Sequence, residues 1–484
     1  MDLHLRALAF LVVALALPWL VTASHPVVAD EIACDQCFEA GLMCDGSCNM
    51  GLGQNGPHRT IVNEYGPDGT PDLSWLNQVR VGYDNGFLIA SKEDLNLQVS
   101  RYPFRIRLNG WGQLRHTLSD VRQIQLTPTS APNRDLNQFQ LKRGRLVFSG
   151  SAFNPDFSYF VQLDGRSSSG DDFRLLDYFL SYDLGHAQFG LKPGTFGFRT
   201  GKYKMPFTMA RWLSGREFEF PDRSVSSTFF DVNRSLAWGL YGQAEAFGKP
   251  LVWETALFNG LVTGGAETGS SGTLDDNFAW STRVYGYPIG DWGTGSLTDF
   301  DWHESLAMRV GFGIALSEID RIGTTEFSRL LVVDSGERLS DLLPATVSSY
   351  SVNLYAMDAS IKYRGWSATL EYYFRTVGDF SGPVAVNDTF DHGFWLQFGY
   401  FLIPRKFQVL TRWSRVEGNS GTLGVSDQSS DEFAGAIAWY FRDNHAKFVA
   451  DITRLNGAPI NSAALDVAPS DDGWLLRSQI QFSF

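Results

Sequence analysis

Apolar and polar residues alternate in twos along most of the chain after about residue 80. In the segment WSATLEYYFRT, Trp366, Leu370 and Phe374 fall on one face, and the opposite face carries polar residues such as Glu371 and Arg375. Successive side chains of a strand point to opposite faces, so this pattern predicts strands with one apolar and one polar face. About sixteen such segments begin near Phe104, Phe139, Phe157, Phe173, Phe196, Leu236, Leu251, Phe278, Leu306, Tyr350, Trp366, Phe390, Lys406, Phe433, Lys447 and Trp474.

The connections between these segments alternate between short turns and long polar loops. Short turns are expected at 154–156, 248–250, 364–365, 403–405 and 442–445. Long loops are expected near 116–138, 205–235, 259–277, 318–348, 377–389, 417–430 and 457–472, and segment 289–303 is longer than a turn should be. Strands of about ten residues, with short turns on one rim and long loops on the other, are typical of outer-membrane barrels. We therefore predict an all-β fold, a transmembrane antiparallel β-barrel of about 16 strands.

A string of soluble β-sandwiches would also show alternating strands. A sandwich buries two apolar faces against each other, and two features of this chain weigh against that arrangement. The apolar faces here begin and end in aromatic residues, as at Phe433 and Phe441, and the opposite faces carry Arg, Gln and Glu. The chain ends on a strand, GWLLRSQIQFSF, whose apolar face includes Phe484. We expect Phe484 to face lipid at the closure of the barrel.

The N-terminal sequence predicts export from the cytoplasm. Arg6 is followed by an apolar run from Ala7 to about Val21 and then by small residues, the pattern of a secretory signal peptide. The predicted organisation is a signal peptide at 1–23, with a second possible cleavage point at Ala29, a cysteine-containing segment and linker at 24–80, and the barrel at 81–484.

All four cysteines fall within fifteen residues, at Cys34, Cys37, Cys44 and Cys48. Exported proteins fold in an oxidising compartment, so two disulfides are the first interpretation. A four-thiolate zinc site is the alternative, although its second pair has the spacing CxxxC rather than CxxC.

The ordered series of strand segments resembles the phosphate-selective porins O and P. The resemblance covers roughly residues 80–484 and rests on VGYDNGFLIAS, NQFQLKRGRLVFSGSAF, FSYFVQLDG, LLDYFLSYDL, GKYKMPFT, NRSLAWGLYGQ and the C-terminal run EFAGAIAWYF…AKFVADITRLNG…WLLRSQIQFSF. It implies a sixteen-stranded porin in the outer membrane of a double-membrane bacterium, commonly a homotrimer, with a long third loop folded into the lumen. It also implies inward Arg and Lys residues that guide small anions, with phosphate or polyphosphate as the solute, and a C-terminal Phe484 that serves as an assembly signal. The cysteine segment has no counterpart in that pattern.

Charge is distributed unevenly along the chain. The net charge is −13, yet residues 101–234 hold 19 Lys and Arg against 12 Asp and Glu. Basic side chains lining a pore lower the barrier for anions whatever the outer loops carry. The strand register predicts pore-lining, anion-guiding roles for Arg105, Arg107, Arg115, Arg143, Arg145, Lys202, Lys204 and Arg309, the two lysines on condition that Gly201 and Tyr203 face outward. The third loop adds the constriction residues Arg211, Arg216, Arg223 and Arg234.

Two other interpretations stay open from the residues alone. Inward arginines can pin a constricting loop through its carboxylates, which applies most to Arg216 and Arg223 beside acidic neighbours. Some outer-membrane barrels are enzymes, but the chain has neither a G-x-S-x-G elbow nor an H-E-x-x-H metal pair. We predict no enzyme activity, no cofactor, no metal and no nucleic-acid partner. The predicted function is passive diffusion of small anions across a lipid bilayer, with a weakly selective general-diffusion porin as the alternative.

Overall fold

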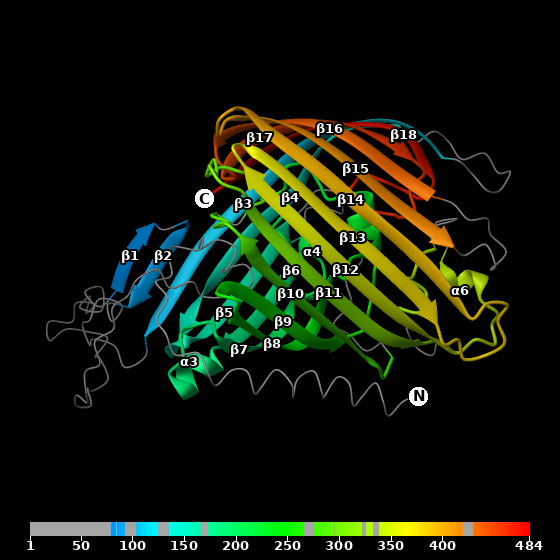
Figure 1. Ribbon diagram of the computed structural model, residues 1–484, viewed down its shortest axis with the longest axis horizontal. Helices are drawn as coiled ribbons and strands as arrows, with labels where there is room; N and C mark the ends of the chain where they lie inside the picture. The colour runs from blue at the N-terminus through cyan, green and yellow to red at the C-terminus, as the bar shows by residue number, and fades with distance from the viewer. Residues whose placement is uncertain are drawn as a thin grey trace, which may run out of the picture. The chain divides into compact units, whose positions relative to one another are not determined.

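A computed structural model of the chain describes residues 79–83, 85–91, 103–123, 135–165, 173–265, 275–294, 296–321, 326–332, 338–419 and 429–484. These residues contain 18 strands in one antiparallel sheet. Strands β3 to β18 each pair with the next, and β18 pairs with β3, so sixteen strands close into a barrel (Figure 1). The predicted fold class is confirmed. The predicted signal peptide and the four cysteines lie outside the described residues.

The barrel strands follow the predicted segments closely. They are β3 (Phe104–Gln123), β4 (Leu136–Ala152), β5 (Asn154–Gly165), β6 (Phe173–Tyr182), β7 (Phe196–Lys204), β8 (Arg234–Ala246), β9 (Lys249–Asn259), β10 (Phe278–Ile289), β11 (Ala307–Asp320), β12 (Ser349–Tyr363), β13 (Trp366–Gly378), β14 (Asp388–Ile403), β15 (Phe407–Asn419), β16 (Ser429–Arg442), β17 (Ala446–Asn456) and β18 (Asp471–Ser483).

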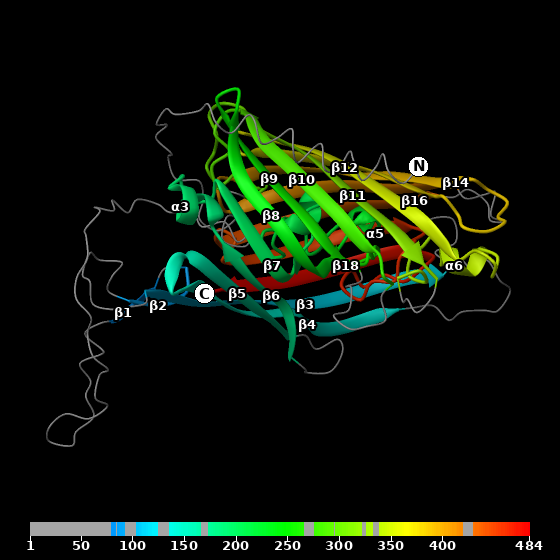
Figure 2. The same cartoon turned by 90° about the horizontal axis from the view of Figure 1, so that it is seen from below.

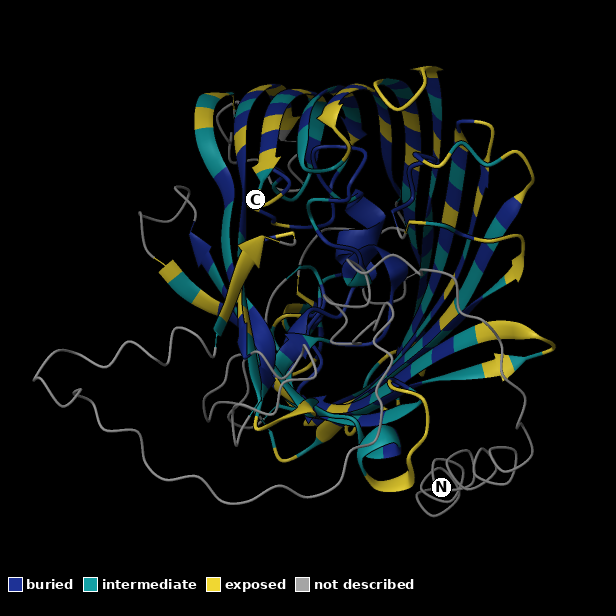
Figure 3. Ribbon diagram, turned by 90° about the vertical axis from the view of Figure 1, so that its left-hand side faces the viewer, coloured by how far each residue is buried: buried dark blue, intermediate teal, exposed yellow. Residues whose placement is uncertain are grey.

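Alternation along each strand separates a buried inner face from an exposed outer face. In β13, Glu371 and Arg375 are fully buried in the lumen, whereas Trp366 and Leu370 are exposed on the outside. Bands of buried and exposed residues alternate along the strands when the barrel is seen from one end (Figure 3). An apolar outer face around a polar interior suits a lipid environment, and every barrel strand is paired on both sides. This fold places the protein in the outer membrane of a double-membrane bacterium. No helix of the described residues has the length and apolar character needed to cross a membrane.

Short turns occupy one rim, the turn side, and long loops occupy the other, the loop side (Figure 2). A single residue, Phe153, links β4 to β5, and two residues link β12 to β13. Two turn-side connections are longer: one contains helix α3 (Leu184–Phe189), and the other is the 290–306 segment between β10 and β11. The second is the connection that the sequence marked as too long for a turn. Its Trp292, Leu297 and Phe300 are buried, and the ring of Phe300 lies 4.9 Å from that of Tyr440.

The connection between β7 and β8, residues 205–233, is the third loop, called the constriction loop below. It contains helices α4 (Met209–Trp212) and α5 (Val225–Phe230). Both begin at a hydroxyl cap: the Thr208 side chain accepts a hydrogen bond from the Arg211 amide, and the Ser224 side chain accepts one from the Ser227 amide. All six residues of α5 are buried inside the barrel. A further short helix, α6 (Leu339–Leu342), lies in a loop-side connection.

A hairpin of β1 (Val79–Tyr83) and β2 (Phe87–Ser91) precedes the barrel and is absent from the sequence-based prediction. β2 pairs with Arg105 to Leu108 of β3, and β18 pairs with β3 from Trp111 onward, so β2 and β18 lie end to end along one edge of β3. Between them, Phe484 exchanges two backbone hydrogen bonds with Gly110. The Phe484 ring is 41% exposed on the outer face and lies 6.1 Å from the Phe87 ring.

Candidate pore constriction

Carboxylates on the barrel wall hold the helices of the constriction loop. Glu371 of β13 accepts hydrogen bonds from the backbone amides of Met209 and Ala210, at the start of α4. Glu432 of β16 accepts one from the amide of Val225, at the start of α5. Free amides at a helix start attract negative charge, so these wall carboxylates fix where each helix docks.

The loop's own carboxylates bind the wall in turn. Glu219 accepts hydrogen bonds from the side chains of Ser367, Gln397 and Gln408 on β13, β14 and β15. Asp231 pairs with Arg211 within the loop, at 3.3 Å. The contacts of Glu219 hold the loop against β13, β14 and β15.

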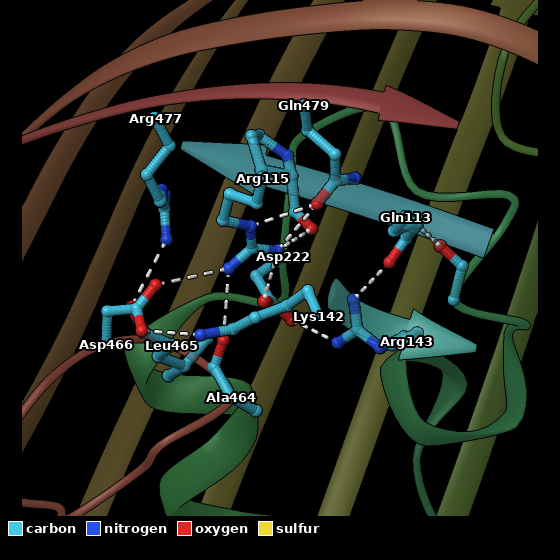
Figure 4. Close-up of polar contacts among 12 residues, drawn as sticks. Gln113, Arg115, Lys142, Arg143, Asp222, Ala464, Leu465, Asp466, Arg477 and Gln479 are labelled. Atoms are coloured by element: carbon cyan, nitrogen blue, oxygen red, sulfur yellow. Dashed lines mark hydrogen bonds and ion pairs between the residues drawn. The ribbon is translucent and has the colours of Figure 1, made fainter. Parts of the chain in front are cut away.

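Asp222 forms the centre of a clamp on the opposite side of the loop (Figure 4). Its two carboxylate oxygens accept hydrogen bonds from Arg115 Nη2 at 2.7 Å and Arg143 Nη2 at 2.5 Å. Arg115 also donates to the Pro221 carbonyl and to Gln479. Burial opposes ionisation of Asp222, but the guanidinium groups of Arg143 and Arg115 outweigh it and hold the pKa of that carboxyl well below its usual range.

The same cations hold the last loop, between β17 and β18. Asp466 lies 2.5 Å from Lys142 Nζ and 3.5 Å from Arg115 Nη1, and it accepts a hydrogen bond from Thr117. Lys142 and Arg143 both reach the lumen because β4 has a bulge there: Gln113 pairs with Arg143 and Leu114 with Leu141, which leaves Lys142 unpaired on the strand.

A cavity of about 60 Å³ remains between the constriction loop and the wall formed by β3 to β9. Its charged lining comprises six cationic side chains and two carboxylates: Arg143, Arg145, Arg199, Lys204, Arg223, Arg234, Asp177 and Glu254. Its aromatic lining comprises Trp111, Phe160, Phe179, Tyr203 and Trp212. The lining therefore holds more cationic side chains than carboxylates, with aromatic rings between the charges.

Both carboxylates of the cavity are paired. Asp177 accepts a hydrogen bond from Arg234 Nε at 2.7 Å, and Glu254 lies 3.3 Å from Arg199 Nη1. Arg199 is further packed over aromatic rings, with its guanidinium carbon 5.1 Å from the centre of the Phe179 ring. These two pairs position their arginines. Two more cations of the lining are paired with carboxylates beside the cavity, Arg143 with Asp222 and Arg145 with Asp164 at 3.2 Å.

Two other cations of the cavity converge on one backbone carbonyl. Lys204 Nζ and Arg223 Nη2 donate to the Leu213 oxygen at 3.2 and 3.1 Å. Arg223 also donates to the carbonyls of Ala210 and Arg211. In the described residues, no carboxylate lies within ion-pair distance of Arg223. Carbonyl groups orient this guanidinium but carry no net charge, so its positive charge stays in the field of the cavity.

The structure distributes the predicted residues among several places. Arg143, Arg145, Lys204, Arg223 and Arg234 line the cavity. Arg105 and Arg107 lie on the inner face of β3 at its turn-side end, opposite the exposed Ile106, and Arg115 belongs to the clamp. Arg216 offers its backbone carbonyl to Lys447 and Gln481, so that part of the loop is pinned through its backbone.

Lys202 differs from the prediction. The expected inward position required Tyr203 to face outward, but Tyr203 is only 3% exposed and lines the cavity with Arg199. Lys202 pairs with Tyr178 and Leu236 and shares their outer face. Lys204 is the last residue of β7; it lines the cavity and donates hydrogen bonds to the carbonyls of Trp212 and Leu213 in the constriction loop.

Arg199, Trp111 and Tyr203 were not predicted as site residues. Arg199 had a usable signal, since it alternates with Gly197 and Gly201, which leave room on the inner face. The Cβ of any larger residue at Gly197 would lie 2.3 Å from the Tyr241 ring. For Trp111 and Tyr203, aromatic residues on a barrel strand fit the lipid face equally well, and only the register separates the two faces.

A separate titratable cluster ties two loops together on the loop side. The Asp275 amide donates to Glu326 Oε1, and the Asp320 amide donates to Asp275 Oδ2 at 2.8 Å. Glu326 is 1% exposed. Burial and the neighbouring Asp275 raise the pKa of Glu326 from 4.5 to about 7.

Replacing Glu326 with glutamine should remove a pH dependence of stability. A carboxyl whose pKa is raised by folding stabilises the fold while it is protonated, and this contribution is lost as the pH rises from about 4.5 through about 7. We therefore expect Glu326→Gln to match the wild type in thermal unfolding temperature at pH 4.5 and to exceed it at pH 8. Glu417→Gln, on an exposed pair, is the control and should follow the wild type at both pH values. Parallel curves for wild type and Glu326→Gln would contradict the assignment.

Comparisons with known proteins support the fold. No family model and no curated protein matches the chain. Among solved structures, the chain is similar to an anion-selective porin from Comamonas acidovorans, with a TM-score of 0.50 and 8% identity over 79% of this chain and 100% of that one. It is similar to the outer membrane protein OmpT of Vibrio cholerae in its trimer form (TM-score 0.47, 10% identity, 78% and 99% of the two chains). It is also similar to the outer membrane channel DcaP of Acinetobacter baumannii (TM-score 0.47, 9% identity, 79% and 97%). At such identities the similarity establishes an outer-membrane barrel fold and no more.

Proposed function

We propose that the protein is an outer-membrane porin for passive diffusion of small anions, with the cavity at the constriction loop as its selective point. The observation that carries the proposal is the lining of that cavity, in which cations outnumber carboxylates and the Arg223 guanidinium is held by backbone carbonyls rather than by a carboxylate. A low-dielectric wall strengthens the field of such a cluster, which lowers the energy of an anion and raises that of a cation. The resemblance to phosphate-selective porins points to phosphate or polyphosphate as solute and to a homotrimer as the assembly.

The clamp and the loop contacts explain why the cationic side chains of the cavity stay close to the lumen. A mobile loop would let the lumen widen, and the influence of fixed charges on a passing ion would fall with distance and with salt screening. Arg115, Arg143 and Glu219 keep the loop in place, so Arg145, Lys204 and Arg223 stay close to the path. A weakly selective general-diffusion porin is the alternative if the outer loops dominate the field.

Reversal potentials in a KCl gradient across a planar bilayer test the proposal. The wild-type pore should prefer chloride, and Lys204→Glu should lower the chloride-to-potassium permeability ratio by about tenfold, since two units of charge are changed beside the path. Lys202→Glu is the matched control: it makes the same change two residues away on the outer face, and it should leave the ratio close to that of the wild type. Phosphate should also block the chloride current. A wild-type pore that prefers potassium would overturn the proposal.

A further inference from the structure

Arg309 differs from the other arginines on the same part of the wall. Arg283, Arg375, Arg412 and Arg477 each lie within ion-pair distance of a carboxylate on the wall. Arg309, on β11, has no exposed surface, and none of its three guanidinium nitrogens has a hydrogen-bond partner among the described residues. A buried charge without a counter-ion is costly, and such a group is satisfied by a paired side chain, by buried water or by a bound ligand.

Two aromatic rings pack against this guanidinium. Its central carbon lies 4.7 Å from the centre of the Tyr285 ring and 5.6 Å from that of the Trp212 ring. The two rings contact each other, with centres 5.4 Å apart. Such faces attract a cation but provide no acceptor in the plane of the guanidinium, so its N–H groups remain available to a ligand.

A second buried cation lies on the neighbouring strand. Lys362 of β12 pairs in register with Ala307, two residues from Arg309, and is also without exposed surface. Its ammonium group donates to the carbonyls of Trp292 and Thr294 in the 290–306 segment. In the described residues, no carboxylate lies within ion-pair distance of Lys362. Two cations therefore lie close together here, and the carboxylates that act on Lys362, those of Asp301, Asp299 and Glu219, lie beyond ion-pair distance.

Trp212 lies against both this region and the cavity. It is the last residue of α4, it lines the cavity, and its ring also packs on the Arg309 guanidinium. The Trp212 side chain is half-buried, whereas Arg309 behind it is fully buried. Trp212 therefore contacts both the cavity and the Arg309 guanidinium.

We propose that Arg309 is a second anion-binding site, reached from the cavity when the Trp212 indole turns aside, and that its ligand is a small inorganic oxyanion of the phosphate class. The planar guanidinium presents paired N–H donors that match two oxygens of such an anion, and Lys362 adds charge on the turn side. The site rests on the proposed function, because it supplies the next binding position for an anion that has entered the cavity.

The test measures phosphate binding both in the open channel and in the folded protein at rest. Arg309→Met keeps the length and the contact with the rings but removes the charge and the donors. It should weaken the block of chloride current by phosphate about tenfold, and it should reduce the rise in thermal unfolding temperature that phosphate gives the wild type in detergent. Arg309→Lys keeps the charge but loses the paired N–H donors of the guanidinium, and it should give an intermediate block. If Arg309→Met folds poorly, this variant still shows whether the charge or the donor geometry matters.

Trp212→Ala tests the route to the site. It should speed both the onset and the release of phosphate block, and the double variant Trp212→Ala/Arg309→Met should bind phosphate no better than Arg309→Met alone. Unchanged phosphate block and unchanged phosphate stabilisation in Arg309→Met, measured in both backgrounds, would overturn the site. A wild-type pore that prefers potassium would overturn the proposed function and not the site. The site is then decided by whether phosphate raises the unfolding temperature of the wild type more than that of Arg309→Met.

Discussion

Replacing Asp222 with alanine should raise the single-channel conductance several-fold and make the current noisy. Asp222 is the partner of both Arg115 and Arg143, and all three side chains are buried. Removing one partner of a buried ion pair leaves an uncompensated charge and costs about 3–5 kcal/mol. Two guanidinium groups would lose their partner here, so we expect the constriction loop to leave this side of the lumen, where the cavity lies.

A carboxylate of another ion pair provides the control for Asp222→Ala. Glu417 pairs with Arg415 at 3.1 Å, but both side chains are partly exposed on β15 and lie outside the clamp. Exposed pairs contribute about 0–1 kcal/mol, so Glu417→Ala should keep the wild-type conductance. Channels of Asp222→Ala with wild-type conductance and noise would show that the contacts of Glu219, Glu371 and Glu432 hold the loop without the clamp.

Deleting Phe484 should sharply reduce the amount of folded protein in the outer membrane. The deletion removes both backbone hydrogen bonds to Gly110 and the ring that covers Gly110 on the outer face. It also removes the contact with Phe87, which joins the end of β18 to the hairpin. The resemblance to phosphate-selective porins implies that the assembly machinery reads this residue, which would add to the structural loss.

Two variants separate the role of the terminal position from a general loss of apolar surface. Phe153→Ser removes a more exposed phenylalanine from a turn on the same rim, and it should assemble normally. Phe484→Trp keeps a terminal aromatic ring and should restore most of the folded protein. For both variants, the amount of folded barrel in outer-membrane fractions is measured on gels from the difference in mobility between heated and unheated samples. Normal levels of folded protein after the deletion would contradict the role given to Phe484.

The strands and the third loop could be predicted because each leaves a local signal. A barrel strand between lipid and a polar lumen must alternate, so segments such as that around Glu371 mark their own inner face. The hairpin β1–β2 left a weaker signal: each strand has five residues, and its pairing depends on the far end of β3. The inward folding of the 290–306 segment depends on distant partners such as Tyr440.

The contacts of the candidate site were harder to predict than its residues. The inner position of Arg115 follows from alternation, but its partner Asp222 is 107 residues away, so the clamp is visible only in three dimensions. For Lys202 and Tyr203, the residue types led to the wrong faces, because a lysine is expected to face the polar lumen and a tyrosine is expected to face lipid. The inner face instead uses Tyr203 as a packing surface for Arg199, at 5.2 Å.

The end-to-end placement of β2 and β18 on β3 has a consequence for how the barrel closes. Closure requires the last strand to find the correct register on the first, and strand pairs can slip in steps of two residues without turning a side chain to the wrong face. A slip of β18 towards the turn side by two residues would bring Phe484 opposite Leu108, a position that Phe87 already occupies. The hairpin thus acts as a physical stop for one direction of slippage, so that a segment outside the barrel fixes the alignment of its final seam.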